Sequence, residues 1–281
     1  MYLKPIFINA TSLSDAWFQT LYKCIEVGRD FKIDKGSFEG QKRLEFDFAT
    51  IHITMPDKGE LLPKVNPQLG FPDPVAEDYL NDYLPYLMTD AEKDGESYTY
   101  GQRICKEKLP NKVVNWDSIE NKNIFIQDKE IWKGLYKKSG SVFTQNSKYV
   151  SDATYFINQM KLMIYTYKNK GYRNNQMIMQ VGQPSDMILK DPPCLRHIDT
   201  RIQDGKLHFF PYFRSWDLWG GFPANLAAIE LMKQYCAEQI GVGNGEIIAS
   251  SKGLHIYDYV WELAESIRGK TIEEFRNEFS L

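Results

Sequence analysis

The stretch PPCLRHIDTRIQDGKLHFFPYFRSWDLWGGFPAN, residues 192–225, determines most of the expected architecture. Its centre holds Asp204-Gly205, a pair that favours a two-residue hairpin turn. We therefore expect two strands joined by this turn, over residues 194–202 and 206–215. Pro211 lies inside the second strand, and a proline there predicts a bulge or an edge position, because it cannot donate a backbone hydrogen bond.

The sequence on either side of this hairpin predicts further strands and helices. After the hairpin, Pro223 suits the first turn of a long helix, and Gly241 suits its C-terminal cap. The remaining expected elements are strands over 43–55, 176–181 and 245–252 and helices over 12–28, 75–88, 152–168 and 254–268. Residues 106–150 are polar and turn-rich and predict only surface structure. Strands that alternate with helices favour an α/β (α+β) fold, with a mixed β-sheet flanked by helices in a single domain over residues 1–281.

Composition excludes several classes of protein. The chain has 281 residues, with 34 Lys and Arg against 37 Asp and Glu, whereas a non-specific nucleic-acid binder carries a basic excess. No apolar run approaches the roughly 18 residues of a membrane span, and the N-terminus lacks the layout of a signal peptide. The four cysteines form no Cys-x-x-Cys pair, which argues against a metal site or a disulfide scaffold. We therefore expect a cytoplasmic protein without a nucleic-acid or membrane partner.

Cys194 is the candidate nucleophile. It follows two prolines at the start of a predicted strand, and Arg196 and Arg214 lie in the same hairpin. A neighbouring guanidinium lowers the pKa of a thiol and so increases the fraction of thiolate, the reactive form. The alternative for a single cysteine is a buried and inert side chain. That interpretation is the one we give to the other three, Cys24, Cys105 and Cys236.

Five further positions carry groups that suit a nucleotide. Arg214 and Ser215 offer a forked cation and a hydroxyl, which together suit a phosphate. The amide of Asn225 can donate and accept at once, as the edge of a uracil ring requires. His255 and Tyr257 place two polar side chains on one side of the chain. Each also has an ordinary structural explanation: a surface ion pair for Arg214, a helix cap for Asn225 and a buried partner for His255.

In this order and at this spacing, the residues resemble the thymidylate synthase family. The words that carry the resemblance are PPC, RSWD, GGFPAN and HIY, all between residues 192 and 259. Counted from Cys194, the four anchors follow at 20, 23, 31 and 61 residues: Arg214, Asp217, Asn225 and His255. A weaker resemblance continues upstream through YTYG at residues 98–101 and through Arg173.

The resemblance implies a role for each matching residue. Cys194 would add to C6 of the pyrimidine, Asn225 would hold the uracil, and Tyr100 would order a water beside it. Asp217 would bind the pterin of the folate. The 5′-phosphate would be bound by Arg214, Ser215 and, more loosely matched, Arg43, and the sugar 3′-hydroxyl by His255 and Tyr257. Arg173 resembles the arginine that members of the family donate across a homodimer interface to the partner's phosphate.

The implied reaction is the methylation of dUMP to dTMP by a homodimer that uses 5,10-methylenetetrahydrofolate. A glutamate usually organises the proton relay in this family. We favour Glu77, in the helix predicted after Pro74, over Glu60. C5 of uracil is a poor nucleophile, so a thiolate must first add at C6, and the charge that builds on O4 requires a hydrogen-bond donor.

Several residues depart from the usual pattern of the family. Phe213, Ala224, Leu195 and Gly253 stand where glutamine, phenylalanine, histidine and aspartate are common, which resembles the archaeal and phage branches. The chain ends EEFRNEFSL, without the small hydrophobic tail that closes over the folate. Exclusion of water favours hydride transfer to the methylene intermediate, which gives a methyl group. Without the tail, water can add to that intermediate and give a hydroxymethyl group, so a pyrimidine nucleotide hydroxymethylase remains an alternative. A non-catalytic nucleotide- or RNA-binding descendant is a second alternative.

Overall fold

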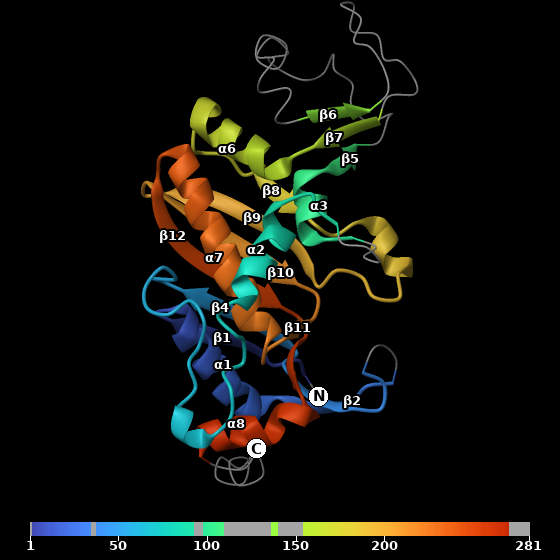
Figure 1. The fold of residues 1–281 in the computed structure, drawn as a ribbon, viewed down its shortest axis with the longest axis vertical. Helices are drawn as coiled ribbons and strands as arrows, with labels where there is room; N and C mark the ends of the chain where they lie inside the picture. Colours follow the sequence, from blue (N-terminus) through green and yellow to red (C-terminus); the bar gives the residue numbers. More distant parts are fainter. Residues whose placement is uncertain (1, 35–37, 93–97, 110–135, 140–153, 270–281) are drawn as a thin grey trace, which may run out of the picture.

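The computed structural model describes residues 2–34, 38–92, 98–109, 136–139 and 154–269 (Figure 1). Its largest element is a six-stranded mixed sheet, in which β1 pairs with β4 and β10 with β12 in parallel, and the other pairs are antiparallel. In sheet order the strands are β1 (Pro5–Ala10), β4 (Phe48–Ile53), β12 (Gly243–Ser251), β10 (Lys206–Phe213), β9 (Leu195–Gln203) and β8 (Ile178–Gln180). The predicted mixed α/β architecture is confirmed.

Two smaller sheets adjoin the large one. The first, in sheet order, consists of β11 (Trp216–Asp217), β13 (Leu254–Tyr257), β3 (Lys42–Glu45) and β2 (Arg29–Lys32). The second consists of β5 (Glu107–Leu109), β7 (Thr154–Ile157) and β6 (Tyr136–Ser139). The register of the first sheet matters for function, because it sets Asp217 beside His255 and Arg43 beside Tyr257.

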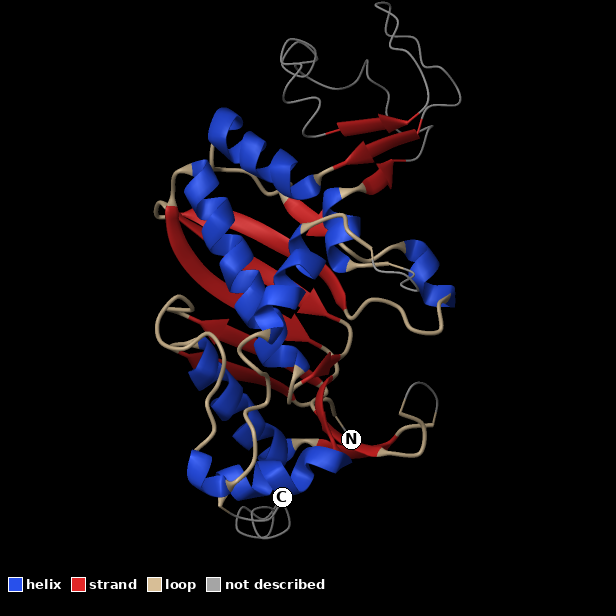
Figure 2. Cartoon of the chain, viewed as in Figure 1, coloured by secondary structure: helices blue, strands red, loops and turns tan. Residues whose placement is uncertain are grey.

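Helices cover one face of the large sheet, with α7 (Gly221–Ile240) along its middle (Figure 2). The other helices are α1 (Leu13–Val27), α2 (Tyr79–Met88), α3 (Tyr100–Cys105), α6 (Gln159–Lys170) and α8 (Trp261–Arg268), and α8 lies beside α1 at the C-terminal end. The 3-10 turns are η1 (Pro67–Leu69), η2 (Pro184–Ile188) and η3 (Asp258–Val260). Along β10, Phe209 and Phe213 are fully buried, whereas Phe210 and Tyr212 on the opposite face are only half-buried. The core therefore lies between the sheet and α7, which also contacts α1, α2 and α6.

The hairpin and the long helix form as predicted. Asp204 and Gly205, which join β9 to β10, both have positive φ angles (51° and 71°), as a tight hairpin turn requires. α7 ends at Gly241, whose φ of 87° provides the left-handed cap. β10 lies between β9 and β12, so of the two alternatives predicted from Pro211 the edge position is excluded. The pairing with β9 does shift register between Tyr212 and Phe213, directly after Pro211, as a bulge would.

The strand predicted over 43–55 is wrong in one respect: it is two strands in two different sheets. The chain bends at Asp47, between β3 and β4. The Asp47 carboxylate accepts a hydrogen bond from the backbone N–H of Lys4 (2.7 Å) and one from Arg29 Nη2 (2.6 Å). These contacts fix the bend, because the carboxylate at the break is held by two distant segments.

Three of the predicted helices begin later than expected. In the range 152–168, residues 152–153 lie outside the described part, and strand β7 follows them. Helix α6 begins after Asn158, whose side chain caps it by accepting a hydrogen bond from the Lys161 N–H (2.9 Å). In 254–268, strand β13 and η3 precede α8. In 75–88, α2 starts at Tyr79, so Val75 and Glu77 lie in the preceding loop. None of the helices in the described part of the chain combines the length and the apolar character that a membrane span needs.

Candidate active site

Cys194 lies at the end of the loop between η2 and β9 and is half-buried. Its carbonyl accepts a hydrogen bond from the Arg214 N–H at 2.9 Å, which places the first residue after β10 beside the cysteine. Burial raises the pKa of the Cys194 thiol above its ordinary value, Arg214 and Arg196 lower it, and Asp191 raises it. The expected guanidinium effect is present, but desolvation outweighs it, so the net shift is the opposite of the one predicted.

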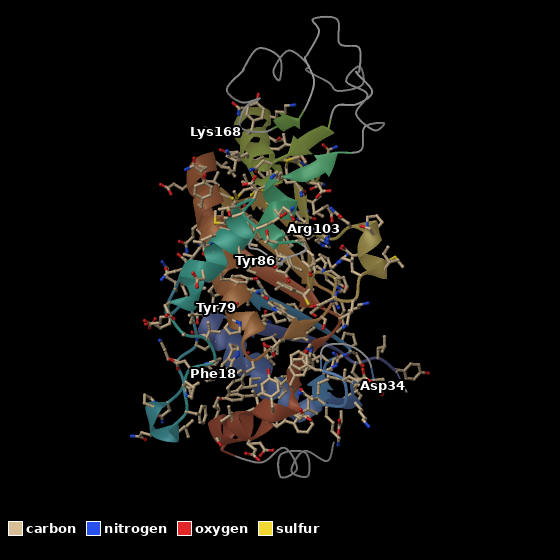
Figure 3. The ribbon with its side chains drawn as sticks, turned by 45° about the vertical axis from the view of Figure 1, so that its right-hand side comes forward. Phe18, Asp34, Tyr79, Tyr86, Arg103 and Lys168 are labelled. Atoms are coloured by element: carbon tan, nitrogen blue, oxygen red, sulfur yellow. The ribbon has the colours of Figure 1, made fainter. Side chains whose placement is uncertain are left out.

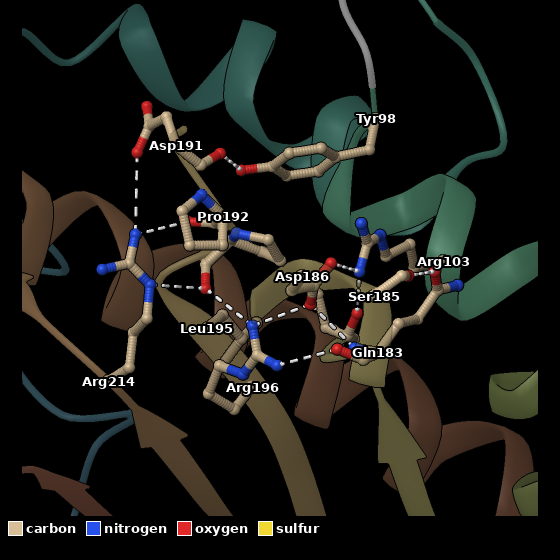
Figure 4. Close-up of polar contacts among 12 residues, drawn as sticks. Tyr98, Arg103, Gln183, Ser185, Asp186, Asp191, Pro192, Leu195, Arg196 and Arg214 are labelled. Carbon is tan, nitrogen blue, oxygen red and sulfur yellow. Dashed lines mark hydrogen bonds and ion pairs between the residues drawn. The ribbon is translucent and has the colours of Figure 1, made fainter. Parts of the chain in front are cut away.

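The Arg214 side chain is anchored to the loop that leads to Cys194 (Figure 4). Its Nε donates to the Pro193 carbonyl (3.2 Å), its Nη2 donates to the Pro192 carbonyl, and Nη2 lies 3.6 Å from Asp191 Oδ1. Among the described residues, Nη1 has no partner, so one of the guanidinium nitrogens keeps both N–H donors for a ligand. The neighbouring Ser215 hydroxyl is half-buried and forms no hydrogen bond with a described residue.

Two tyrosines approach the same loop from the start of α3. The Tyr100 hydroxyl accepts a hydrogen bond from the backbone N–H of Leu195 (3.4 Å), next to Cys194. Burial raises the pKa of Tyr100 well above its ordinary value, and the nearby Cys194 raises it further, so its phenol stays protonated. Tyr98 donates to the Asp191 carbonyl (3.1 Å), and burial raises its pKa to about 12.

Asn225 is held from two sides at the start of α7. Its Oδ1 accepts a hydrogen bond from Trp216 Nε1 (2.9 Å), and its Nδ2 donates to the Tyr83 hydroxyl (2.5 Å). An indole can only donate, so the Trp216 contact fixes which end of the amide is oxygen. Among the described residues, one N–H and one lone pair of Asn225 stay available, and they match the O4 acceptor and N3–H donor of a uracil ring.

A row of tyrosine rings connects Asn225 to the region of Cys194. Tyr79 and Tyr83 stack at 5.7 Å between ring centroids, Tyr83 and Tyr86 at 5.5 Å, and Tyr86 meets the edge of Tyr100 at 5.4 Å. Figure 3 shows Tyr79 and Tyr86 along α2 and Arg103 on α3. The row places an aromatic wall beside the candidate site; Tyr79, Tyr83 and Tyr86 belong to the helix predicted after Pro74, and Tyr100 belongs to α3.

The Asp217 carboxylate caps the N-terminus of α7. Its Oδ1 accepts from the Trp219 N–H (3.2 Å), and its Oδ2 accepts from the N–H groups of Gly220 (3.0 Å) and Gly221 (2.9 Å). These three bonds use three of the roughly four acceptor positions of a carboxylate. A rigidly held oxygen on Asp217 therefore keeps one lone pair for a donor on a ligand.

His255 and Tyr257 lie on one face of β13, two residues apart. His255 is 2% exposed, and its Nδ1 lies 2.8 Å from the Gly253 carbonyl, which can only accept, so Nδ1 carries the proton. Its Nε2 is then an acceptor, buried and without a partner among the described residues. Burial lowers the pKa of His255 to about 4, so the ring is neutral at pH 7. Burial raises the pKa of Tyr257 to about 12.

Arg43 enters the same small sheet from β3, in register with Tyr257. Its Nη2 lies 2.8 Å from Glu45 Oε2, and its side chain is partly exposed. Burial raises the pKa of Glu45, and Arg43 lowers it, with a net increase. A Cβ at Gly253 would lie 3.6 Å from Glu45 Oε2, so the Glu45 carboxylate approaches the place where other members of the family carry an aspartate.

Three of the residues considered for the site, Glu77, Glu60 and Arg173, form no contact in the described structure with Cys194, Arg214 or Asn225. Glu77 is exposed, and its carboxylate pairs with Lys64 Nζ at 2.5 Å. We favoured Glu77 over Glu60 because we expected it to lie in a helix, and that expectation is wrong, since α2 begins at Tyr79. Glu60 is exposed as well. Arg173 is exposed beyond the end of α6 and forms no ion pair with a described residue. The relay role of Glu77 therefore stays a prediction, as does the role of Arg173 toward a partner.

Two of the unusual residues find an explanation in packing. Phe213 is fully buried and stacks on Trp216, with ring centroids 4.0 Å apart and planes 8° from parallel, so it supports the indole that holds Asn225. Leu195 is 1% exposed and contributes its backbone N–H, rather than a side chain, to Tyr100. Sequence reasoning missed Tyr83 and Trp216 as partners of Asn225; the helical spacing of Tyr79, Tyr83 and Tyr86 was the available signal.

A mixed α/β fold with a loop-borne cysteine, a guanidinium beside it and an oriented amide is the arrangement of a nucleotide-modifying enzyme. The family model described as thymidylate synthase matches residues 101–275. The chain is 38% identical over 260 residues to a protein of Methanosarcina barkeri and 25% identical over 262 residues to one of Methanosarcina acetivorans, both named "Putative thymidylate synthase"; each match covers 92% of this chain and 93% of the relative. It is also 24% identical over 175 residues to the thymidylate synthase of Listeria monocytogenes, which covers 62% of this chain and 55% of that protein.

The chain therefore belongs to the thymidylate synthase family, and it is an enzyme of the one-carbon transferase class. The resemblance stated from PPC, RSWD, GGFPAN and HIY is confirmed. The archaeal relatives agree with the archaeal character of the unusual residues.

Proposed function

We propose that this protein transfers the one-carbon unit of 5,10-methylenetetrahydrofolate to C5 of dUMP, giving dTMP, through a covalent bond between Cys194 Sγ and C6 of the uracil. The observation that carries the proposal is the position of Arg214 against Cys194. Its backbone N–H bonds to the Cys194 carbonyl, and its side chain bonds to the two prolines before it. The positive charge is thus held where it stabilises a thiolate.

The residues around Cys194 suit the electron flow of this addition. When the thiolate adds to C6, electron density moves to O4 of the uracil, and C5 becomes nucleophilic. The free N–H of Asn225 supports stabilisation of O4, since a donor already in place costs no reorganisation during the reaction. Tyr100, protonated and close to Cys194, is suited to hold a water beside the base.

Besides the base, the nucleotide would be held at its 5′-phosphate and at its sugar 3′-hydroxyl. The free Nη1 of Arg214 and the Ser215 hydroxyl suit the 5′-phosphate, and the partly exposed Arg43 adds a second cation. The unpartnered Nε2 of His255 is an acceptor for the sugar 3′-hydroxyl, with the Tyr257 hydroxyl beside it. A buried acceptor without a partner costs stability, and a ligand hydroxyl would satisfy it.

The residues present fit a folate. When bound, 5,10-methylenetetrahydrofolate supplies the one-carbon unit and, for a methyl product, the hydride. Asp217 would hold the pterin, because its fixed carboxylate keeps one acceptor for the N–H donors of that ring. The aromatic row of Tyr79, Tyr83 and Tyr86 supports the placement of flat rings next to the site and the exclusion of water from it.

We propose a homodimer as the active form. The half-buried face of the large sheet carries Phe210 and Tyr212, and among the described elements the helices lie on the other face. An apolar sheet face of this kind suits a second copy. Arg173 would then be the residue offered to the phosphate in the partner subunit.

The test is incubation with dUMP labelled with tritium at C5 and 5,10-methylenetetrahydrofolate, followed by identification of both products by mass. We expect tritium release, dTMP and dihydrofolate, and we expect Cys194→Ser to abolish all three while Cys105→Ser, a matched control at another half-buried cysteine, retains them. Tetrahydrofolate together with a product heavier by one oxygen would instead assign the hydroxymethylase reaction. Nucleotide binding without tritium release would overturn the proposal of catalysis.

A further inference from the structure

Asp186, in η2, is a buried carboxylate that meets two arginines at once (Figure 4). Its Oδ1 lies 2.7 Å from Arg103 Nη1, and its Oδ2 accepts hydrogen bonds from Arg196 Nη1 (2.8 Å) and from the Gln183 N–H (2.7 Å). Burial raises the pKa of Asp186, but the Gln183 N–H and the two guanidiniums outweigh burial and leave the pKa below its ordinary value. The charged carboxylate therefore joins η2, α3 and β9.

The loop that follows Asp186 is held largely by side chains that donate to its backbone carbonyls. Pro192 and Pro193 have no backbone N–H, so immediately before Cys194 the main chain offers only carbonyl acceptors. Arginine side chains are donors only, and they satisfy these acceptors. The Pro193 carbonyl receives Arg214 Nε at 3.2 Å and Arg196 Nη1 at 3.3 Å, so two guanidiniums fix the peptide that precedes the cysteine.

Arg196 is seated against the backbone of Gly182. A Cβ built at Gly182 would lie 2.5 Å from both Nε and Nη2 of Arg196, so only a glycine leaves room for the guanidinium. The N–H groups of Val181 and Gly182 both donate to the Arg196 carbonyl, at 3.0 and 2.7 Å. The φ angle of Gly182 is not positive, so the left-handed conformation does not require a glycine there, and the three atoms nearest to an added Cβ all belong to the Arg196 guanidinium.

The same carboxylate fixes the helix that carries Tyr100. Arg103 lies on α3, one turn after Tyr100, and its Nη1 also donates to the Val181 carbonyl at 2.8 Å. Its guanidinium lies 4.7 Å from the centroid of the Tyr98 ring, and Tyr98 in turn donates to the Asp191 carbonyl. Asp186 therefore connects both sides of the Cys194 loop.

We propose that Asp186 is a positioning residue for Cys194, which holds Arg196 against the Pro193 carbonyl and so fixes the orientation and the charge environment of the sulfur. The reaction that this serves rests on the proposed function, whereas the effect on the thiol does not. Arg196 is among the groups that lower the pKa of Cys194, so displacing its guanidinium makes the thiolate less stable.

Asp186→Asn is not a suitable test, because it would leave the buried Arg103 guanidinium without its carboxylate. The test therefore displaces Arg196 instead. Gly182→Ala pushes the guanidinium away from its position beside Gly182, and Arg196→Lys keeps the charge but replaces the planar guanidinium whose Nη1 donates to both Asp186 and Pro193. Arg201→Lys, at an exposed arginine of the same strand, is the matched control. The pH dependence of Cys194 alkylation by iodoacetamide is measured for each, with Cys194→Ser as the blank for the other thiols.

We expect the alkylation midpoint of both test variants to move to higher pH, while the control keeps the wild-type profile. With dUMP and the folate, kcat should fall by about 10- to 100-fold, as for a displaced reacting group, with KM for dUMP little changed. An unchanged alkylation profile in both test variants, with thermal unfolding showing that they are folded, overturns the proposal. If the wild-type protein turns over no dUMP, the proposed function fails, and the alkylation profiles still decide the role of Asp186.

Discussion

Trp216 donates its indole N–H to Oδ1 of Asn225 at 2.9 Å, and this one contact sets the direction of the amide that faces the candidate base site. With the amide reversed, two N–H groups would face each other, which is unfavourable in a half-buried position. Tyr83, a hydroxyl that can donate or accept, is compatible with either direction. The choice between a uracil edge and a cytosine edge therefore depends on Trp216.

We predict that Trp216→Phe reduces the preference for dUMP over dCMP in binding. The lost hydrogen bond allows the Asn225 amide to rotate, and the cost of the unmatched partner is on the order of 1–3 kcal/mol. Binding of both nucleotides is measured by calorimetry without folate. Phe213→Leu is the control, because it disturbs the packing of Trp216 but keeps its N–H. If that variant loses the preference equally, packing and not the hydrogen bond is responsible.

Arg214 should govern the reactivity of Cys194 in a predictable direction. Burial raises the pKa of the thiol, and Arg214 is the largest effect that opposes it, so Arg214→Gln should raise the pKa further. The rate of alkylation at pH 8 should fall, and its midpoint should move to higher pH. Arg201→Gln, which removes an exposed arginine from β9, should leave the midpoint in place. An unaltered midpoint in Arg214→Gln would show that the guanidinium does not act on the sulfur.

The local pattern of the sequence was sufficient for the elements whose boundaries are set by neighbouring residues. The turn at Asp204-Gly205 and the end of α7 at Gly241 depend on backbone conformations that those residues favour by themselves. The break at Asp47 could not be predicted in this way, because its carboxylate is held by Lys4 and Arg29 from other parts of the chain.

The same distinction applies to the candidate site. The spacing of Cys194, Arg214 and Asn225 identified a group of residues, and the structure places Arg214 against the cysteine. Two properties of the site depend on long-range contacts and could not be predicted from the sequence. One is the partnership of Asn225 with Tyr83, which is 142 residues away. The other is the sign of the pKa shift of Cys194, since the extent of its burial is not encoded locally.

His255 should make the stability of the protein depend on pH. Its pKa in the folded state is about 4, below the ordinary value of 6.5, so the unfolded chain binds more protons between these two values. This contribution to stability is complete above pH 6.5 and is lost as the pH falls toward 4. Between pH 7 and pH 5 the free energy of unfolding should fall by about 2 kcal/mol because of this residue.

Urea unfolding at pH 7 and pH 5 measures this effect. The difference between the two pH values should be smaller by about that amount in His255→Gln, which has no titrating ring. His208→Gln, at a half-buried histidine of β10, is the control and should keep the wild-type difference. Equal pH dependence in His255→Gln and the wild type would mean that His255 is not buried in the neutral form.

The final prediction concerns a buried ion pair between Glu230 and Lys233 in α7. Both side chains are fully buried, with Lys233 Nζ 2.9 Å from Glu230 Oε2 and also donating to the Gly245 carbonyl, while Glu230 Oε1 accepts from Gln234 and Asn244. Lys233→Met leaves the Glu230 charge without its counterion inside the core. We expect a loss of about 3–5 kcal/mol in the free energy of unfolding.

The double variant Glu230→Gln with Lys233→Met separates charge from packing. A neutral amide at position 230 still accepts from Gln234 and Asn244, so most of the lost stability should return. Chemical denaturation of the two variants and the wild type gives the comparison. If the double variant is as unstable as Lys233→Met, the loss comes from the hydrogen bond to Gly245 and the packing of the lysine stem rather than from an unpaired charge.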